Sequence, residues 1–260
     1  MTAPAMVPAR LRPLAIFAGL LAVWQVVVLL TDVPPFILPD PLRVARSLAE
    51  NAELIAGHAA ITLTEIVAGF LIGTAVGMGS ALAMSYFRPA RRWLMPVLVV
   101  SQAVPVFALA PILTLWLGYG MESKIAMAVL IIYFPVTAAF YDGLRRTSPG
   151  WVDLARVMNA SRWAQLRHIR LPAALPALGS GLRVAAAVAP IGAVVGEWVG
   201  SSAGLGYLML HANARVQIEL MFAALFVLAI IACVLYFTLD AAVRRMLPWQ
   251  PEPTPDEDTR

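Results

Sequence analysis

The clearest candidate for chemistry is a single acid inside an apolar segment. Glu197 lies in the run 177–199, where every other residue except Arg183 is uncharged. A carboxylate at that depth is costly in lipid, so it faces protein or water and marks a functional position by default. Three roles stay open for it: gating of a substrate, an ion pair with a residue such as Arg215, and reaching out to the membrane surface.

No other set of side chains has the spacing of a catalytic or metal site. His58, His168 and His211 lie in different segments, and no cluster of His, Asp, Glu or Cys accompanies them. The chain also lacks the G-x-x-x-x-G-K-S/T loop that cradles nucleotide phosphates. We therefore expect no catalytic residue, no metal and no cofactor of its own, and predict that the chain is not an enzyme.

A polar segment over 145–176 is the longest interruption of the apolar sequence. Both of its halves carry apolar residues at helical spacing, which predicts two short amphipathic helices. Asn159 can adopt the left-handed conformation that ends the first helix, Ser161 can cap the second, and Pro172 is expected to end it. Such a hairpin can dock into a groove of a soluble partner, or it can lie on lipid headgroups; the residues alone leave both open.

The elements that position these residues are predicted to be membrane helices. Hydrophobic residues make up 60% of the chain and charged residues only 13%, against about 45–50% and about 25% in soluble domains. The mean hydropathy is +0.79. So few charges cannot cover a soluble surface, and lipid is the expected solvent. The predicted fold class is an all-α integral membrane protein.

About six segments are long and apolar enough to cross a hydrocarbon layer of about 30 Å. They form one predicted membrane domain over 14–247, with spans at about 14–31, 61–86, 94–117, 124–143, 177–199 and 219–240. After the first span, Asp40 is expected to cap a short helix over 42–54. Residues 1–13 precede the domain, and the Pro-rich, acidic tail 248–260 is predicted to be disordered.

The basic residues are divided unequally between the two sides of these spans. Fourteen of the 19 Lys and Arg residues lie on the same side as the N-terminus, and four lie on the other side. Because Lys and Arg accumulate in cytoplasmic loops, both termini and the segment 145–176 are predicted to be cytoplasmic. The same bias accounts for a pI near 9.6 without a nucleic-acid partner.

Two of the predicted spans contain glycines four residues apart, a spacing that lets helices approach closely in lipid. Packing within the chain and a seam with a second copy of the chain are both compatible with it. The glycines are Gly69, Gly73 and Gly77 in one span, and Gly192, Gly196 and Gly200 in the other.

Two prolines interrupt the third predicted span. Pro105 and Pro111 can break the helix and expose backbone groups toward a transport pathway, or they can merely kink it. If the helix breaks, Gln102 and Phe107 lie close to the break. These two residues, Pro105 and Glu197 are the candidates for lining a pathway.

The polar segment 145–176 resembles the EAA loop of binding-protein-dependent ABC importer permeases. That pattern runs Glu-Ala-Ala, three residues, Gly, about nine residues, and Ile-x-Leu-Pro. Asp153-Leu154-Ala155 stands at the first position, Asn159 at the Gly, and Ile169-Arg170-Leu171-Pro172 matches the end fully. Asp for Glu, Leu for Ala and Asn for Gly are departures that keep the local chemistry. The resemblance implies that the ATPase is contacted by Asp153, Leu154, Ala155, Asn159, Ala160, Ile169, Leu171 and Pro172.

The resemblance covers nearly the whole chain, from about residue 24 to 249, and is to the nitrate, sulfonate and taurine branch of these permeases. It rests on the stretches 33–39, 111–120 and 201–208. Within the branch, 140–146 and 190–198 look most like permeases for hydroxymethylpyrimidine, a thiamine precursor. Sulfonate, taurine or nitrate is the alternative substrate class.

The resemblance also implies a set of partners and a location. The fold would be that of a type I ABC importer, in the bacterial inner membrane. Two copies of the chain, as a homodimer, would form the pore, two cytoplasmic ATPase subunits would bind ATP, and a periplasmic solute-binding protein would deliver the substrate.

Two other protein classes can be compared with this expectation. An ion-coupled secondary transporter should carry several intramembrane charges, and by the sequence only Glu197 qualifies. A membrane-embedded enzyme should show clustered His, Asp or Glu near one membrane surface, and no such cluster is present in the sequence.

Overall fold

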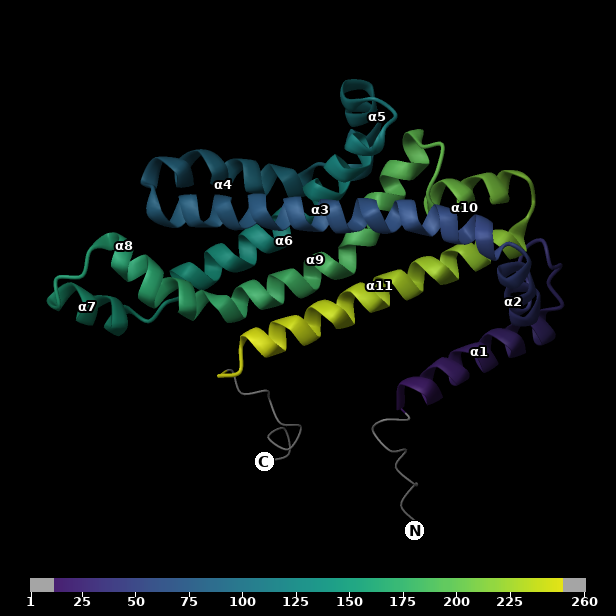
Figure 1. Ribbon diagram of the computed structural model, residues 1–260, viewed down its shortest axis with the longest axis horizontal. Helices are drawn as coiled ribbons and strands as arrows, with labels where there is room; N and C mark the ends of the chain where they lie inside the picture. Colours follow the sequence, from purple (N-terminus) through teal and green to yellow (C-terminus); the bar gives the residue numbers. More distant parts are fainter. Residues whose placement is uncertain (1–11, 250–260) are drawn as a thin grey trace, which may run out of the picture.

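The computed structural model describes residues 12–249, and helices are the only regular elements over that range (Figure 1). The fold class predicted from the sequence is confirmed. The helices are α1 (Arg12–Thr31), α2 (Pro41–Glu50), α3 (Ala52–Tyr86), α4 (Arg88–Ala103), α5 (Val106–Leu117), α6 (Met121–Arg145), α7 (Pro149–Val157), α8 (Arg162–Gln165), the π-helix η1 (Leu166–Arg170), α9 (Leu171–Gly200), α10 (Leu205–Ala214) and α11 (Ile218–Met246).

Within residues 12–249, four helices are long and apolar enough to cross a membrane: α3, α6, α11 and the continuous helix of α8, η1 and α9. The bent pair α4 and α5 makes a fifth if it counts as one span, and α1 contributes a shorter apolar stretch, Ala15–Thr31. Every predicted span therefore coincides with helix, although one of them is divided. The predictions for residues 1–11 and 250–260 lie outside the described residues.

The divided span is the one predicted over 94–117. In the structure α4 and α5 meet at an angle of 106°. Val104 is extended, with φ −86° and ψ 119°, because the residue before a proline is pushed out of the α region, and Pro105 has no N–H to continue the helix. Pro111 lies inside α5 without breaking it. Of the two outcomes expected for this segment, a break and a kink, the structure shows a break at Pro105.

The short helix α2, between α1 and α3, begins at a side-chain cap. Asp40 accepts a hydrogen bond from the backbone N–H of Arg43 at 2.9 Å, so its predicted role at the start of α2 is confirmed. This helix ends at Glu50, earlier than expected, and α3 begins directly after Asn51. The 35 residues of α3 span about 50 Å, which exceeds the hydrocarbon layer.

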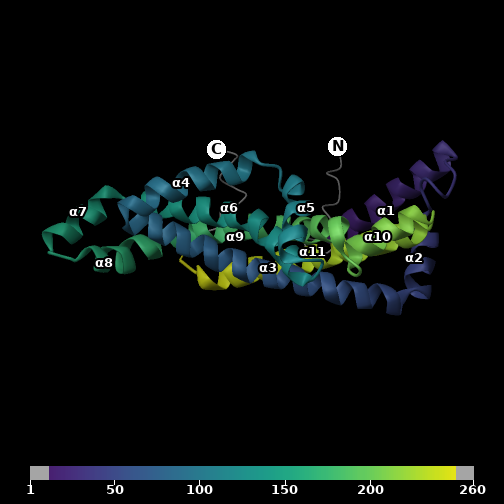
Figure 2. The same ribbon diagram turned by 90° about the horizontal axis from the view of Figure 1, so that it is seen from above.

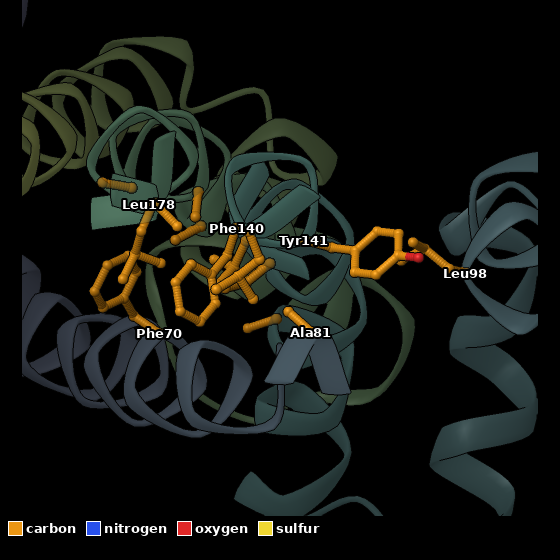
Figure 3. Close-up of a cluster of buried hydrophobic side chains, with 14 of the residues drawn as sticks. Phe70, Ala81, Leu98, Phe140, Tyr141 and Leu178 are labelled. Carbon is orange, nitrogen blue, oxygen red and sulfur yellow. The ribbon is translucent and has the colours of Figure 1, made fainter. Parts of the chain in front are cut away.

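The core lies where α6 packs between α3 and α9. Figure 3 shows part of it, where Phe70 from α3, Leu178 from α9 and Phe140 from α6 lie close together. Ala81 and Tyr141 continue the cluster toward Leu98 of α4. Both overall views place the hairpin of α7 and α8 at one end of the long axis, and α2 and α10 at the opposite end (Figures 1 and 2).

Two glycines let the three core helices approach at one residue, Ala128 of α6. A methyl group at Gly192 would lie 2.6 Å from the Cα of Ala128, and one at Gly69 would collide with its Cβ. The four other glycines predicted to pack also lie against residues of the same chain: Gly73 on Ile132, Gly77 on Val136 and Thr137, Gly196 on Lys124, and Gly200 on Thr114 and Tyr119.

An ion pair ties the hairpin-side half of α9 to α11. The Nε of Arg183 lies 2.6 Å from Oδ1 of Asp240, and the Nε of Arg244 lies 2.8 Å from the other carboxylate oxygen. Both Arg183 and Asp240 are half-buried, so the pair is better shielded than an exposed one.

We expect Gly69→Ala to lower the unfolding temperature of the detergent-purified protein by about 2 to 10 °C, because overpacking costs about 1 to 3 kcal/mol. Gly79→Ala is the matched control: it lies on the same helix, gains the same helix propensity, and its added methyl group meets no atom within 4 Å. Equal unfolding temperatures for the two variants would contradict the close approach of α3 to Ala128.

Candidate functional site

The turn between α7 and α8 is closed by a Schellman motif. The N–H of Ala160 donates to the carbonyl of Ala155 at 2.9 Å, and the N–H of Asn159 donates to the carbonyl of Arg156, also at 2.9 Å. Asn159 has a φ of +57°, the left-handed conformation that this motif requires. Ser161 then caps α8 by accepting from the N–H of Ala164 at 3.2 Å. The two helices and the turn predicted from the sequence are therefore present.

The first helix of the hairpin presents an apolar face to the outside. Leu154 is 54% exposed and Val157 81% exposed, while Ala155 and Val152 are buried. The exposed face also includes Trp151 and Met158. Exposed apolar side chains gathered on one short helix of a polar segment mark a candidate interaction site.

Asp153, on the same helix, is exposed to a partner protein. It forms an ion pair with Arg156 at 2.8 Å, and both side chains are 64% exposed. An exposed pair three residues apart contributes little to stability, about 0 to 1 kcal/mol. The carboxylate can therefore exchange this partner for another at small cost.

The second half of the hairpin differs from the prediction. Pro172 does not end a helix; it is the second residue of α9, directly after the π-helix η1, and the helix continues through it. The π-turn η1 leads into α9, with the N–H of Leu171 donating to the carbonyl of Leu166. Residues Arg162–Gly200 thus form one helix of 39 residues. Leu166 and Leu171 pack on the core, and Ile169 is half-buried.

The far end of this helix carries Glu197, which is 1% exposed. Its Oε1 accepts from the hydroxyl of Thr62 at 2.6 Å, and its Oε2 accepts from the N–H of Gly206. The same hydroxyl accepts from the N–H of Leu205 at 2.7 Å. Glu197 therefore binds the beginning of α10, and neither an ion pair with Arg215 nor an outward-reaching side chain is observed.

His58 completes this attachment. Its Nδ1 accepts from the N–H of Gly204 at 3.0 Å, so that three side chains from α3 and α9 bind three consecutive N–H groups at the start of α10. Gly204 has a φ of +106°, which glycine adopts without strain. We call Glu197, Thr62 and His58, with the N–H groups they bind, the α10 clasp.

Two further charged residues are buried beside the α10 clasp, and the sequence interpretation missed both. Glu65 is 2% exposed, and its Oε2 has no hydrogen-bond partner among the described residues. Lys124 is 1% exposed, and its Nζ donates to the carbonyls of Tyr119, Gly120 and Gly200 at 2.5, 2.8 and 2.8 Å. The lysine therefore binds the carbonyl end of α9.

The sequence carried a signal for one of these residues. Glu65 is the only acid in the span predicted over 61–86, and the reasoning applied to Glu197 applies to it equally. Lys124 gives no such signal, because it stands at the end of the span predicted over 124–143, where a charge is ordinary. Glu197 is therefore not the only buried charge in the predicted spans. The number of intramembrane charges alone does not separate this chain from an ion-coupled transporter.

The remaining pathway candidates lie elsewhere. Gln102, Pro105 and Phe107 are exposed at the break between α4 and α5. Over the described part of the chain, none of them has a hydrogen bond to the α10 clasp. The structure therefore does not join them with Glu197 into one site.

Comparison with known proteins identifies the family. Residues 73–249 match the family described as binding-protein-dependent transport system inner membrane component. The chain belongs to this family. A 56% identical ABC transporter permease protein from Haemophilus influenzae covers 91% of this chain and 97% of its own length. The formylaminopyrimidine transport permease ThiX from Halalkalibacterium halodurans is 33% identical and covers 92% of this chain and 96% of itself.

A solved structure shares the fold of this ABC permease. A chain of the MetNI methionine ABC transporter, in an inward-facing conformation, has a TM-score of 0.63 at 19% identity, over 74% of this chain and 95% of its own. The protein is thus the membrane subunit of an ABC importer, with the type I importer fold, and is not an enzyme.

We expect Thr62→Val to destabilise the permease by about 1 to 3 kcal/mol, because it leaves a buried carboxylate oxygen and the N–H of Leu205 without partners. Thr64→Val is the control: its hydroxyl, exposed on the same helix, bonds only to the carbonyl of Ala60. Hydrogen exchange should accelerate over α10 in the first variant alone. Unchanged exchange there would contradict the α10 clasp.

Proposed function

We propose that this permease forms the pore of an ATP-driven importer and receives force through the hairpin of α7 and α8. The observation that carries the proposal is the exposed apolar face of α7, which is joined through α8 and η1 to a helix that reaches the other end of the bundle. A soluble ATPase that docks on this face would move α9 as a rigid body. Asp153, Leu154, Asn159 and Ala160 lie on the exposed hairpin, while Ala155, Ile169 and Leu171 support it from within.

The importer is assembled from two copies of the chain, two ATPase subunits and a periplasmic solute-binding protein. The hairpin and both termini face the cytoplasm, as the distribution of basic residues favours. ATP is bound by the ATPase subunits, because the sequence of the permease lacks a phosphate-binding loop. The second permease copy completes the pore, as the resemblance to this class of importer implies.

We expect Leu154→Asp to abolish co-purification with the ATPase and to lower ATP-driven uptake about tenfold or more, because truncating or charging an anchor in a docking face costs about 2 kcal/mol or more. Asp153→Arg should act in the same direction. Leu154→Met keeps the apolar volume and should retain uptake. Wild-type uptake by Leu154→Asp in proteoliposomes would rule out docking through this face.

The proposed substrate is a small polar nitrogen heterocycle, such as a hydroxymethylpyrimidine-type thiamine precursor. Its support is the resemblance of 140–146 and 190–198 to such permeases and the 33% identity to ThiX, whose name specifies formylaminopyrimidine transport. Aliphatic sulfonate, taurine or nitrate is the alternative within the same importer class.

The cognate solute-binding protein decides between these substrates, because it selects the ligand before the pore does. Calorimetric titration with hydroxymethylpyrimidine, formylaminopyrimidine, taurine and nitrate should show binding of a pyrimidine at micromolar or lower concentration. The same pyrimidine should compete for uptake in vesicles that contain the complete importer. Binding of taurine or nitrate with no pyrimidine binding would move the assignment to the alternative.

A further inference from the structure

A basic pocket lies between the hairpin and the neighbouring ends of α3, α4 and α6. It has a volume of about 460 Å³ and is lined by side chains from six helical elements. Its polar lining includes the hydroxyl of Ser85 and the amide of Gln165. Six of its twelve lining residues are arginines: Arg88 and Arg91 of α4, Arg145 of α6, Arg156 of α7, Arg162 of α8 and Arg170 of η1.

These arginines are not neutralised within the described part of the chain. No carboxylate lines the pocket, and Arg156 alone among the six has an ion pair, the exposed one with Asp153. Arg145 lies over the ring of Tyr141, with 5.6 Å between its Cζ and the ring centroid. Six guanidinium groups drawn together without an anion repel one another, so the arrangement favours a multiply charged ligand.

The donor chemistry fits a phosphate group. A guanidinium presents its N–H groups as a planar fork that matches phosphate oxygens in pairs, and several arginines around one volume can satisfy all of the oxygens together. A single carboxylate, with two oxygens and one charge, would leave most of these donors unused.

Exposed aromatic side chains lie beside the pocket. Trp163 and Phe87 are more than half exposed beside it, and Trp93 follows on α4 with 79% exposure. The ring of Trp163 packs edge-on against Tyr86, a pocket residue, with 6.3 Å between centroids. Exposed Trp and aromatic residues gather where a membrane protein meets the headgroup layer.

We propose that this pocket binds a phosphate-bearing anion, supplied by the headgroup of an anionic lipid, and that the bound headgroup joins the hairpin to α4 and α6. A basic pocket between membrane helices is a recognised setting for anionic headgroups. Because three of the arginines belong to the hairpin and the adjoining η1, and the other three to α4 and α6, the ligand bridges the two parts. This site is independent of the substrate and of the pathway through the pore.

The test is native mass spectrometry of the full-length, delipidated permease titrated with phosphatidylglycerol or with phosphatidylcholine. Wild type should bind one phosphatidylglycerol per chain in preference to phosphatidylcholine. The variant Arg88→Gln/Arg91→Gln should weaken that binding at least about tenfold. The matched control is Arg92→Gln/Arg146→Gln, which removes the same charge from the same end of the molecule outside the pocket and should bind within about twofold of wild type.

Inorganic pyrophosphate distinguishes the two sources of phosphate. Tight binding of pyrophosphate that is lost in the pocket variant, with displacement of the lipid, would assign the site to a soluble phosphate anion; no displacement at millimolar concentration supports the lipid. If the double variant does not purify, Arg91→Gln and Arg92→Gln are compared instead.

Three results would overturn the proposal. The first is that the pocket variant and the control variant weaken phosphatidylglycerol binding equally, which would mean that the lipid is attracted by the overall positive charge and not by the pocket. The second is that wild-type permease neither prefers phosphatidylglycerol to phosphatidylcholine nor binds pyrophosphate, while the pocket variant fails to co-purify with the ATPase. The pocket would then be a binding site for a segment of the ATPase. The third is phosphatidylglycerol binding that appears only after deletion of 250–260, a segment with four acids, which would make the chain's own tail the occupant.

Discussion

Ala128 of α6 is the residue at which glycines bring two other helices of the bundle into close contact. Glycines from α3 and α9 bring both of those helices against it with no side chain between. In lipid there is no hydrophobic driving force for apolar helices to associate, so close van der Waals packing must supply the association energy. The remaining contacts, including the Phe140 cluster and the ion pair of Arg183 with Asp240, extend outward from this three-helix core.

This core gives α9 its mechanical role. The helix is fixed at its middle by α6, and it continues through η1 into the hairpin on one side. On the other side, Glu197 holds α10 and Lys124 holds the last carbonyl of α9. In the proposed mechanism, a displacement of the hairpin would be transmitted through α9 to the buried polar groups at its opposite end. The exposed apolar face of α7 is where such a displacement would begin.

Patterns that depend on neighbours in the sequence predicted the structure well. The cap at Asp40, the left-handed Asn159 and the cap at Ser161 are local, and each was found at its residue. Of the two outcomes expected at Pro105, a break and a kink, the structure shows the break, whereas the expectation that Pro172 ends a helix was wrong. Pro105 follows an extended Val104, whereas Pro172 follows the π-helix η1 and the helix continues through it.

The partners of buried charges could not be read from the sequence. Glu197 and Thr62 are 135 residues apart, and nothing in either segment indicates that they meet. Lys124 binds the end of α9 across 76 residues, although its position at a span end suggested an ordinary surface charge. The basic pocket likewise draws arginines from elements that only the tertiary fold brings together.

The most direct test of the account is whether the hairpin and α9 move as one body. Spin labels at Gly150, where an added side chain meets nothing closer than 3.9 Å, and at exposed Val184 report the distance between them by pulsed electron resonance, in a Cys233→Ser background diluted with unlabelled permease. The assembled importer should give the same distance distribution with and without ATP. A shifted or second distance on ATP binding would mean that the hairpin swings at η1, which would contradict rigid transmission through α9.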